Sequence, residues 1–231
     1  MLKFIEGMYV GKEMFNGLPV AYLSIKDDKF ISIIKKLQSM SCISNALLSE
    51  YILYQEICKI EQRSITKKNI SPTLSIIKLS LITSITMKTA CFFDETKGSY
   101  SLSRLFNELS APRSRSCIIL AGIDYEFDEN DLKFAFSEFQ KCKRKLKKLK
   151  REKNNLRIMR NSILAHFDED FISGHIEIMP DAGISSAIHW VLIFIHSINR
   201  YAMFRYCRRS DIYAAIRESH KNFLDQVFNS A

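Results

Sequence analysis

The feature that most restricts the fold of this chain is its scarcity of chain-breaking residues. Only seven Gly and four Pro occur among 231 residues, whereas a protein built from many short strands needs numerous turns rich in both. Hydrophobic residues make up 47% of the chain and charged residues 26%, which is enough apolar material for a core and argues against disorder. The sequence therefore predicts an all-α protein, an antiparallel bundle of long helices with few connections.

Apolar residues recur at steps of three and four along most of the chain, which is the helical period. Asp27 or Asp28 can cap a helix that runs to about Arg63. Ser71 and Pro72 form a start signal for the next helix, which ends near Phe93. Further helices are expected at about 102–109, 112–122, 184–207 and 211–228.

Two segments depart from this pattern. Residues 1–28 contain three Gly and one Pro and lack a clear period, so we interpret them as an irregular N-terminal arm, with a single helical domain over residues 29–231. Residues 171–180 carry alternating isoleucines before a Pro-Asp-Ala-Gly turn, which indicates a small β-hairpin or a loop.

The longest expected helix is strongly basic and runs unbroken from the acids at 128–131 to about Phe167. Between Lys141 and Arg160 it carries eleven Lys or Arg and one acid, Glu152, a local charge of 11 − 1 = +10. Because the whole chain has a formal charge of +9, the remainder is close to neutral, at 9 − 10 = −1. This concentration indicates that the chain contacts a polyanion in one place.

We expect this stretch to collect RNA by counterion release, with little preference for sequence. The candidate RNA-binding residues are Lys147, Lys148, Lys150, Arg151, Lys153 and Arg157. Two alternatives stay open, an acidic protein partner and a simple solvated helix face. A second patch, with Arg200 and Tyr201 followed by residues 205–209, has aromatic rings among guanidiniums. Such a stripe can stack bases, but core packing with snorkelling arginines is the preferred interpretation.

The candidate catalytic residues lie near the end of the basic helix: Arg160, Asn161 and His166. Metal-independent cleavage of RNA needs a base for the 2′-hydroxyl proton and a cation for the charge that gathers on the phosphate. Histidine titrates near neutral pH, and arginine offers a permanently charged planar fork that fits phosphate oxygens. This pair therefore has the right chemistry for RNA cleavage.

Residues 160–168, Arg-Asn-Ser-Ile-Leu-Ala-His-Phe-Asp, resemble the HEPN superfamily, whose members carry an Arg, often followed by Asn, and a His four to six residues later. They are most similar to its abortive-infection U-type (AbiU2-like) branch. So is the stretch 92–106, with an apolar-Asp turn before a Ser-Leu helix start. The resemblance covers roughly residues 30–210.

This resemblance implies an endoribonuclease of toxin–antitoxin or phage-defence type that leaves a cyclic phosphate. Arg160 and His166 would be its catalytic residues, and Asn161 would orient the phosphate or hold the His. The alternative is a non-catalytic HEPN-like module that binds RNA or protein, including an inactive half of a defence pair covered by a separate acidic antitoxin.

Geometry bears on the proposed pair. Six residues at about 100° each place Arg160 and His166 about 120° apart around an ideal helix, so they flank a groove. A site assembled from two copies of this helix would bring them together, and related proteins are usually dimers, so we expect a homodimer. Alternatively, Arg160 pairs with an acid such as Asp168 or Asp170, while His166 caps backbone carbonyls.

Other classes of protein are not indicated. The six cysteines include no pair closer than sixteen residues, so no zinc knuckle or redox motif is supported, and a reducing cytoplasm fits best. His189 and His196 share a helix face without a nearby carboxylate and are expected to pack in the core. The longest apolar run, 184–198, is shorter than the ~20 residues of a membrane span. We therefore expect no metal, no cofactor and no membrane segment.

Overall fold

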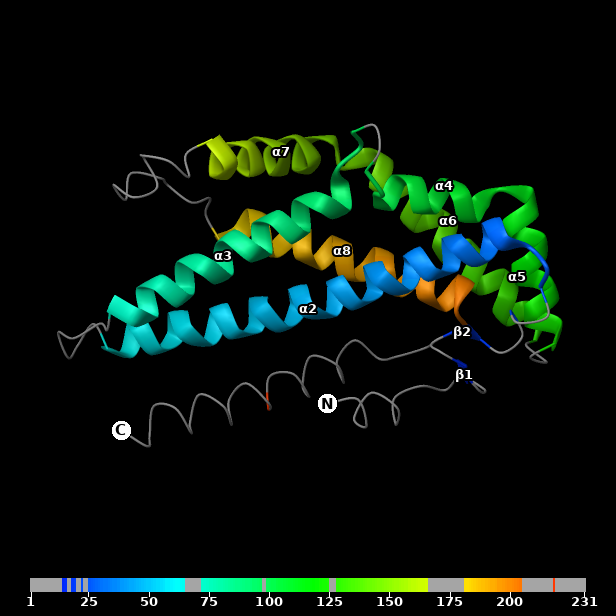
Figure 1. The fold of residues 1–231 in the computed structure, drawn as a ribbon, viewed down its shortest axis with the longest axis horizontal. Coiled ribbons are helices and arrows are strands. Elements are labelled where there is room, and N and C mark those ends of the chain that lie inside the picture. The colour runs from blue at the N-terminus through cyan, green and yellow to red at the C-terminus, as the bar shows by residue number, and fades with distance from the viewer. Residues whose placement is uncertain are drawn as a thin grey trace.

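The computed structural model describes the following residues: 14–15, 18–19, 22, 25–64, 72–96, 99–124, 128–165, 181–204 and 218. Seven α-helices and one two-stranded hairpin lie in these segments, so the predicted all-α fold is confirmed (Figure 1). The hairpin expected near 171–180 lies outside the described residues, and so does the helix expected at 211–228, apart from the helical residue Glu218. The division into an arm and one helical domain stays a prediction.

The first two long helices form an antiparallel pair, α2 (Asp28–Ser64) and α3 (Pro72–Phe93) (Figure 1). Asp27 caps α2 as expected, because its Oδ1 accepts a hydrogen bond of 3.0 Å from the backbone N–H of Phe30. Arg113 also donates to this carboxylate. Before α2, strands β1 (Met14–Phe15) and β2 (Leu18–Pro19) pair antiparallel, a small ordered element within the predicted irregular arm.

Two short helices, α4 (Leu102–Ser110) and α5 (Pro112–Asp124), lie at one end of the bundle (Figure 1). Ser101 caps α4 by accepting a hydrogen bond of 3.4 Å from the backbone N–H of Arg104. One face of α4 is buried through Leu102, Leu105, Phe106 and Leu109. This spacing of three and four residues packs α4 against the core and fixes the turn that precedes it.

The prediction of one unbroken basic helix was wrong, because the chain forms α6 (Glu129–Lys148) and α7 (Lys150–Ala165) instead. The break lies at Leu149, whose φ of −81° and ψ of 42° leave the helical region. No Gly or Pro marks it. The two halves instead follow different neighbours, since α6 packs on α8 (Asp181–Ala202) and α7 packs on α3. Bending at the buried Leu149 lets apolar residues on both sides of the break, Leu146 and Leu156, remain in the core.

Helix α8 runs through the middle of the bundle and contacts α2, α3, α4 and α6. Aromatic rings gather around it: Phe139 lies 4.9 Å from Phe106 and 4.6 Å from Tyr201 between ring centroids. Tyr201 is 3% exposed, and burial raises the pKa of its hydroxyl to about 12. Tyr201 is thus a core residue and not a platform for bases; the other members of that patch beyond Phe204 lie outside the described residues.

By length and composition, α3 is apolar enough to cross a bilayer, with a mean hydropathy of 1.4 over Thr73–Phe93. Core helices also meet this criterion. Helix α3 has buried side chains such as Ile82 and Ile85, and it contacts α7, α8 and α2. The apolar run singled out in the sequence, 184–198, forms part of α8, where Val191 and Ile198 are fully buried.

Candidate functional site

Arg160 lies on α7 and forms an ion pair with Asp94, the residue that directly follows α3. Its Nη1 donates to Asp94 Oδ2 at 2.6 Å, and the two side chains are only 20% and 19% exposed. The ion pair therefore joins two parts of the chain that are 66 residues apart in sequence. These are the two segments in which the sequence resembles the abortive-infection branch.

Asp94 is held firmly in place by its own turn. Its Oδ1 accepts a hydrogen bond of 3.0 Å from the backbone N–H of Thr96, and its carbonyl accepts one of 2.7 Å from Ser99 Oγ. The Thr96 N–H, together with Arg160 and against the effect of partial burial, lowers the pKa of the Asp94 carboxyl below its ordinary value of 3.8. Asp94 is consequently an anion at neutral pH.

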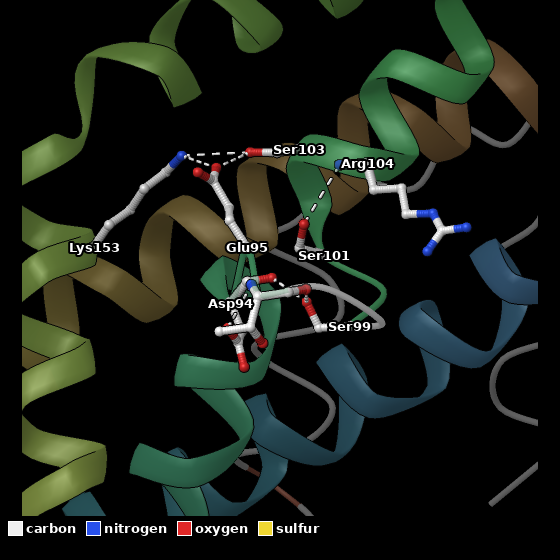
Figure 2. Close-up of polar contacts among 8 residues, drawn as sticks. Asp94, Glu95, Ser99, Ser101, Ser103, Arg104 and Lys153 are labelled. Atoms are coloured by element: carbon white, nitrogen blue, oxygen red, sulfur yellow. Dashed lines mark hydrogen bonds and ion pairs between the residues drawn. The ribbon is translucent and has the colours of Figure 1, made fainter.

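The next residue, Glu95, makes a parallel contact with α7 (Figure 2). Its Oε1 lies 2.5 Å from Lys153 Nζ and accepts a hydrogen bond, also 2.5 Å, from Ser103 Oγ on α4. Lys153 is 18% exposed, and this ammonium is the main reason that the pKa of Glu95 lies below its ordinary value. Two adjacent acids thus neutralise two of the predicted site cations, which lie seven residues apart on α7.

The remaining edge of the Arg160 guanidinium faces its neighbour. Nε and Nη2 both donate to Asn161 Oδ1, at 3.4 and 3.3 Å, and Asn161 is exposed. These bonds are longer than the usual ~2.9–3.0 Å and are correspondingly weak. The structure therefore brings Asn161 and Arg160 together, as the prediction of a joint role requires.

His166 lies outside the described residues, and so do Asp168 and Asp170, the two acids considered as partners for Arg160. The predicted geometry between Arg160 and His166 is accordingly untested. Arg160 does pair with an acid, as the alternative expected, but this acid is Asp94 and not Asp168 or Asp170. Sequence reasoning missed this partner because it searched near Arg160 in the chain. The signal was present in the adjacent acids at the end of an apolar helix.

The predicted RNA-binding residues fall into two groups. Lys147, Lys148, Lys150 and Arg151 are exposed around the α6–α7 break, and none of them forms an ion pair with another described residue. Arg157 is also exposed and donates to Asn154 Oδ1 at 3.1 Å. Lys153 differs, because Glu95 already neutralises it. The structure therefore leaves five of the six predicted cations open to solvent.

Three other cations of the basic stretch make contacts within the fold. Lys141 pairs with Glu138, Lys143 donates to Ser110 Oγ at 2.8 Å, and Lys145 lies 4.6 Å from the centre of the Trp190 ring. Burial lowers the pKa of the Lys143 ammonium. Lys143 and Lys145 thus join α6 to α4 and α8, and the predicted RNA-binding cations lie at the break and along α7.

In the described part of the chain, no metal centre lies at these residues, and the cavity found there lies elsewhere. Among the described residues, no three His, Cys, Asp or Glu side chains lie close enough together to hold a metal ion. A shallow cavity of about 130 Å³ lies between α2 and α8 and is lined by Tyr51, Gln55, Ser185, His189 and three apolar residues. None of the predicted site residues lines it. The candidate site is therefore a surface on α7, which suits an extended ligand such as an RNA backbone.

The two segments joined by Asp94 and Arg160 both lie within one family match, which assigns the chain to the abortive-infection modules of the HEPN type. The model of the HEPN_AbiU2 family, described as AbiU2, matches residues 29–189, well over half of the chain, and the chain belongs to this family. The match contains Asp94, Arg160, Asn161 and His166. Comparisons with curated proteins and with solved structures found no matching protein.

Proposed function

We propose that this protein is a metal-independent endoribonuclease of the toxin–antitoxin or phage-defence type, which works in the cytoplasm. The observation that carries the proposal is the placement of Arg160. The partly buried carboxylate of Asp94 holds its Nη1, and the other edge of the guanidinium lies at the molecular surface beside Asn161. Membership of a HEPN family supports it, because HEPN domains are often ribonucleases.

In this reaction, His166 removes the proton from a ribose 2′-hydroxyl, and the 2′ oxygen attacks the adjacent phosphorus. The P–O5′ bond breaks, the leaving 5′ oxygen takes up a proton, and a 2′,3′-cyclic phosphate remains. Arg160 stabilises the charge that develops on the phosphate oxygens, as a fixed guanidinium does well. Asn161 helps to orient the same phosphate. All of this chemistry proceeds without a metal ion or a cofactor.

The exposed cations would bring the substrate to this site. Lys150 and Arg160 are separated by ten residues of α7, about 15 Å at ~1.5 Å per residue, which spans a few nucleotides of backbone. Lys147, Lys148 and Arg151 continue the positive surface around the break. Such a surface binds RNA with little sequence preference and strong salt dependence.

Two further partners belong to the proposal. A second copy of the chain would complete the active site, because Arg160 and His166 on one helix flank a groove rather than point at one spot. A separate acidic antitoxin would cover the exposed cations and keep the enzyme inactive. Sedimentation at micromolar concentration tests the first expectation, and a monomer with full activity would contradict it.

The decisive experiment compares purified wild type with Arg160→Ala and His166→Ala on labelled RNA in the presence of EDTA. We expect wild type to cut RNA and leave cyclic phosphate ends. His166→Ala should lose cutting and Arg160→Ala should cut far more slowly, while the far-UV circular dichroism of both variants stays unchanged. His220→Ala, outside the family match, is the matched control and should cut normally. Unchanged cleavage by His166→Ala would remove that residue from the mechanism.

A second candidate function is a non-catalytic module that holds RNA or a protein partner. It is favoured by the exposed cations at the α6–α7 break, which are sufficient for binding on their own. This function predicts salt-sensitive RNA binding that survives His166→Ala and falls when Lys147, Lys148 and Arg151 are neutralised together. Absence of RNA affinity at low salt would count against both functions.

A further inference from the structure

We propose that Asp94 is a positioning residue: its carboxylate holds Nη1 of Arg160 so that the Nε and Nη2 edge of the guanidinium is presented to a phosphodiester. This inference rests on the proposed ribonuclease function. It assigns a task to a residue that touches neither the RNA nor the reacting atoms.

The first step is the rigidity of Asp94 itself. It follows directly after the buried pair Phe92 and Phe93, which anchor the end of α3 in the core. The Thr96 N–H fixes one carboxylate oxygen, at 3.0 Å, and Ser99 fixes the backbone carbonyl, at 2.7 Å. The second carboxylate oxygen, Oδ2, is therefore held in a fixed position facing α7, where it accepts the hydrogen bond from Arg160.

The second step is the division of the guanidinium between two kinds of partner. Nη1 donates a short, charge-assisted hydrogen bond of 2.6 Å to Asp94, whereas Nε and Nη2 donate to Asn161 at 3.4 and 3.3 Å. Bonds between two charged groups are shorter and stronger than bonds to a neutral amide. The Asp94 contact is thus the durable one, and the Asn161 contact is the one that a ligand can displace.

The third step is the match to phosphate. The Nε and Nη2 hydrogens are parallel and suit two oxygens of one phosphate group. A single amide oxygen from an exposed Asn161 now receives both. An arriving phosphodiester replaces that oxygen with two oxygens that share one negative charge, while Asp94 keeps the plane of the guanidinium unchanged. Because a reactant misplaced by about 1 Å can cost a rate factor of about 10², the orientation of this plane matters for catalysis.

Glu95 provides a matched control. It is the adjacent residue in the same turn, and it also forms an ion pair with α7, but through Lys153 and not Arg160 (Figure 2). Glu95→Gln therefore removes a neighbouring, more exposed ion pair between the turn and α7 without touching the guanidinium. A purely structural role for such links predicts that Asp94→Asn and Glu95→Gln have the same effect.

The experiment measures kcat and KM for RNA cleavage by the full chain with Asp94→Asn, Glu95→Gln, Arg160→Ala and the double variant Asp94→Asn/Arg160→Ala. We expect Asp94→Asn to lower kcat on the order of 10²-fold with KM unchanged or lower, since one negative charge near the RNA is gone. Glu95→Gln should keep kcat within about twofold of wild type, although its KM can fall because Lys153 is no longer neutralised. The double variant should be no slower than Arg160→Ala alone, because Asp94 acts through Arg160.

Melting temperatures of all variants control for folding, and Asp94→Glu, which restores the carboxylate, should recover part of the lost kcat. A wild-type kcat for Asp94→Asn, or an equal loss for Glu95→Gln, would overturn the positioning role while leaving the ribonuclease function standing. If wild type and Arg160→Ala cut RNA equally, the proposed function fails and the positioning role fails with it.

Discussion

Neutralising exposed cations at the α6–α7 break should weaken RNA binding by an amount that can be worked out in advance. Five predicted cations are exposed: Lys147, Lys148, Lys150, Arg151 and Arg157. For a single strand, log Kobs falls against log salt with a slope of about −0.7 per neutralised phosphate, so contact by all five gives a slope of about −3.5. Each cation removed should reduce the slope by about 0.7 and the affinity at about 0.1 M salt by about fivefold.

The assay is fluorescence anisotropy of a labelled single-stranded RNA across a salt series, with His166→Ala as the background so that the RNA stays intact. Lys148→Gln should give the single-cation effect, and the triple change at Lys147, Lys148 and Arg151 should lower the affinity about 100-fold at about 0.1 M salt. Lys153→Gln is the control. Because Glu95 already neutralises Lys153, its removal should leave the slope unchanged.

Two results would refute this reasoning. Equal slopes for wild type and Lys148→Gln would mean that the exposed cations at the break do not contact RNA. A slope lowered equally by Lys153→Gln and Lys148→Gln would mean that the Glu95 contact opens when RNA binds, so that pairing within the fold does not predict which cations are available.

Three further predictions follow from the described contacts. Phe139→Ala should lower the free energy of unfolding in urea by about 3–5 kcal/mol, because this ring is fully buried among other aromatic rings; a loss below about 1 kcal/mol would contradict that packing. Arg113 and a backbone N–H lower the pKa of Asp27 below 3.8, so the contribution of this carboxylate to stability is present above that pH and is lost as pH falls toward the folded-state pKa. Asp27→Asn should therefore reduce the fall in melting temperature between neutral pH and about pH 3. An unchanged fall would show that the Asp27 carboxylate does not contribute to the pH dependence of stability. Asn161→Asp should place a carboxylate on the open edge of Arg160 and weaken RNA binding in the anisotropy assay at least about tenfold, whereas Asn161→Ala, which only removes an orienting amide, should weaken it much less; equal affinities for both variants would show that phosphate does not use this edge.

The position of Asp94 changes how the candidate site is understood. From the sequence, Arg160 was either free for catalysis or neutralised by an acid, as two exclusive interpretations. The structure makes both interpretations compatible. The acid, Asp94, binds only Nη1, and Nε and Nη2 form weak hydrogen bonds to an exposed amide. An ion pair at an arginine therefore does not exclude a ligand at the same residue, since the guanidinium has more than one bonding edge.

The amino-acid sequence by itself determined the helical class, the starts of α2 and α3, and the concentration of charge. Asp27 before α2 and Pro72 at the start of α3 act within one turn of the chain, so their effect is visible in the residues alone. The period of apolar residues is likewise local, and it identified the all-α class. The spacing of Arg160, Asn161 and His166 was equally visible and carried the family resemblance that the family match bears out.

Tertiary structure alone decided which partner each segment received. Leu149 carries no breaker signal, yet the helix ends there because α6 follows α8 while α7 follows α3. In the sequence, nothing indicates that Lys153 and Arg160 form ion pairs. In the fold, the turn after α3 places Glu95 beside Lys153 and Asp94 beside Arg160. The physical reason is range: caps and helical period act over a few residues, whereas ion pairs and burial depend on which distant segments the packing brings together.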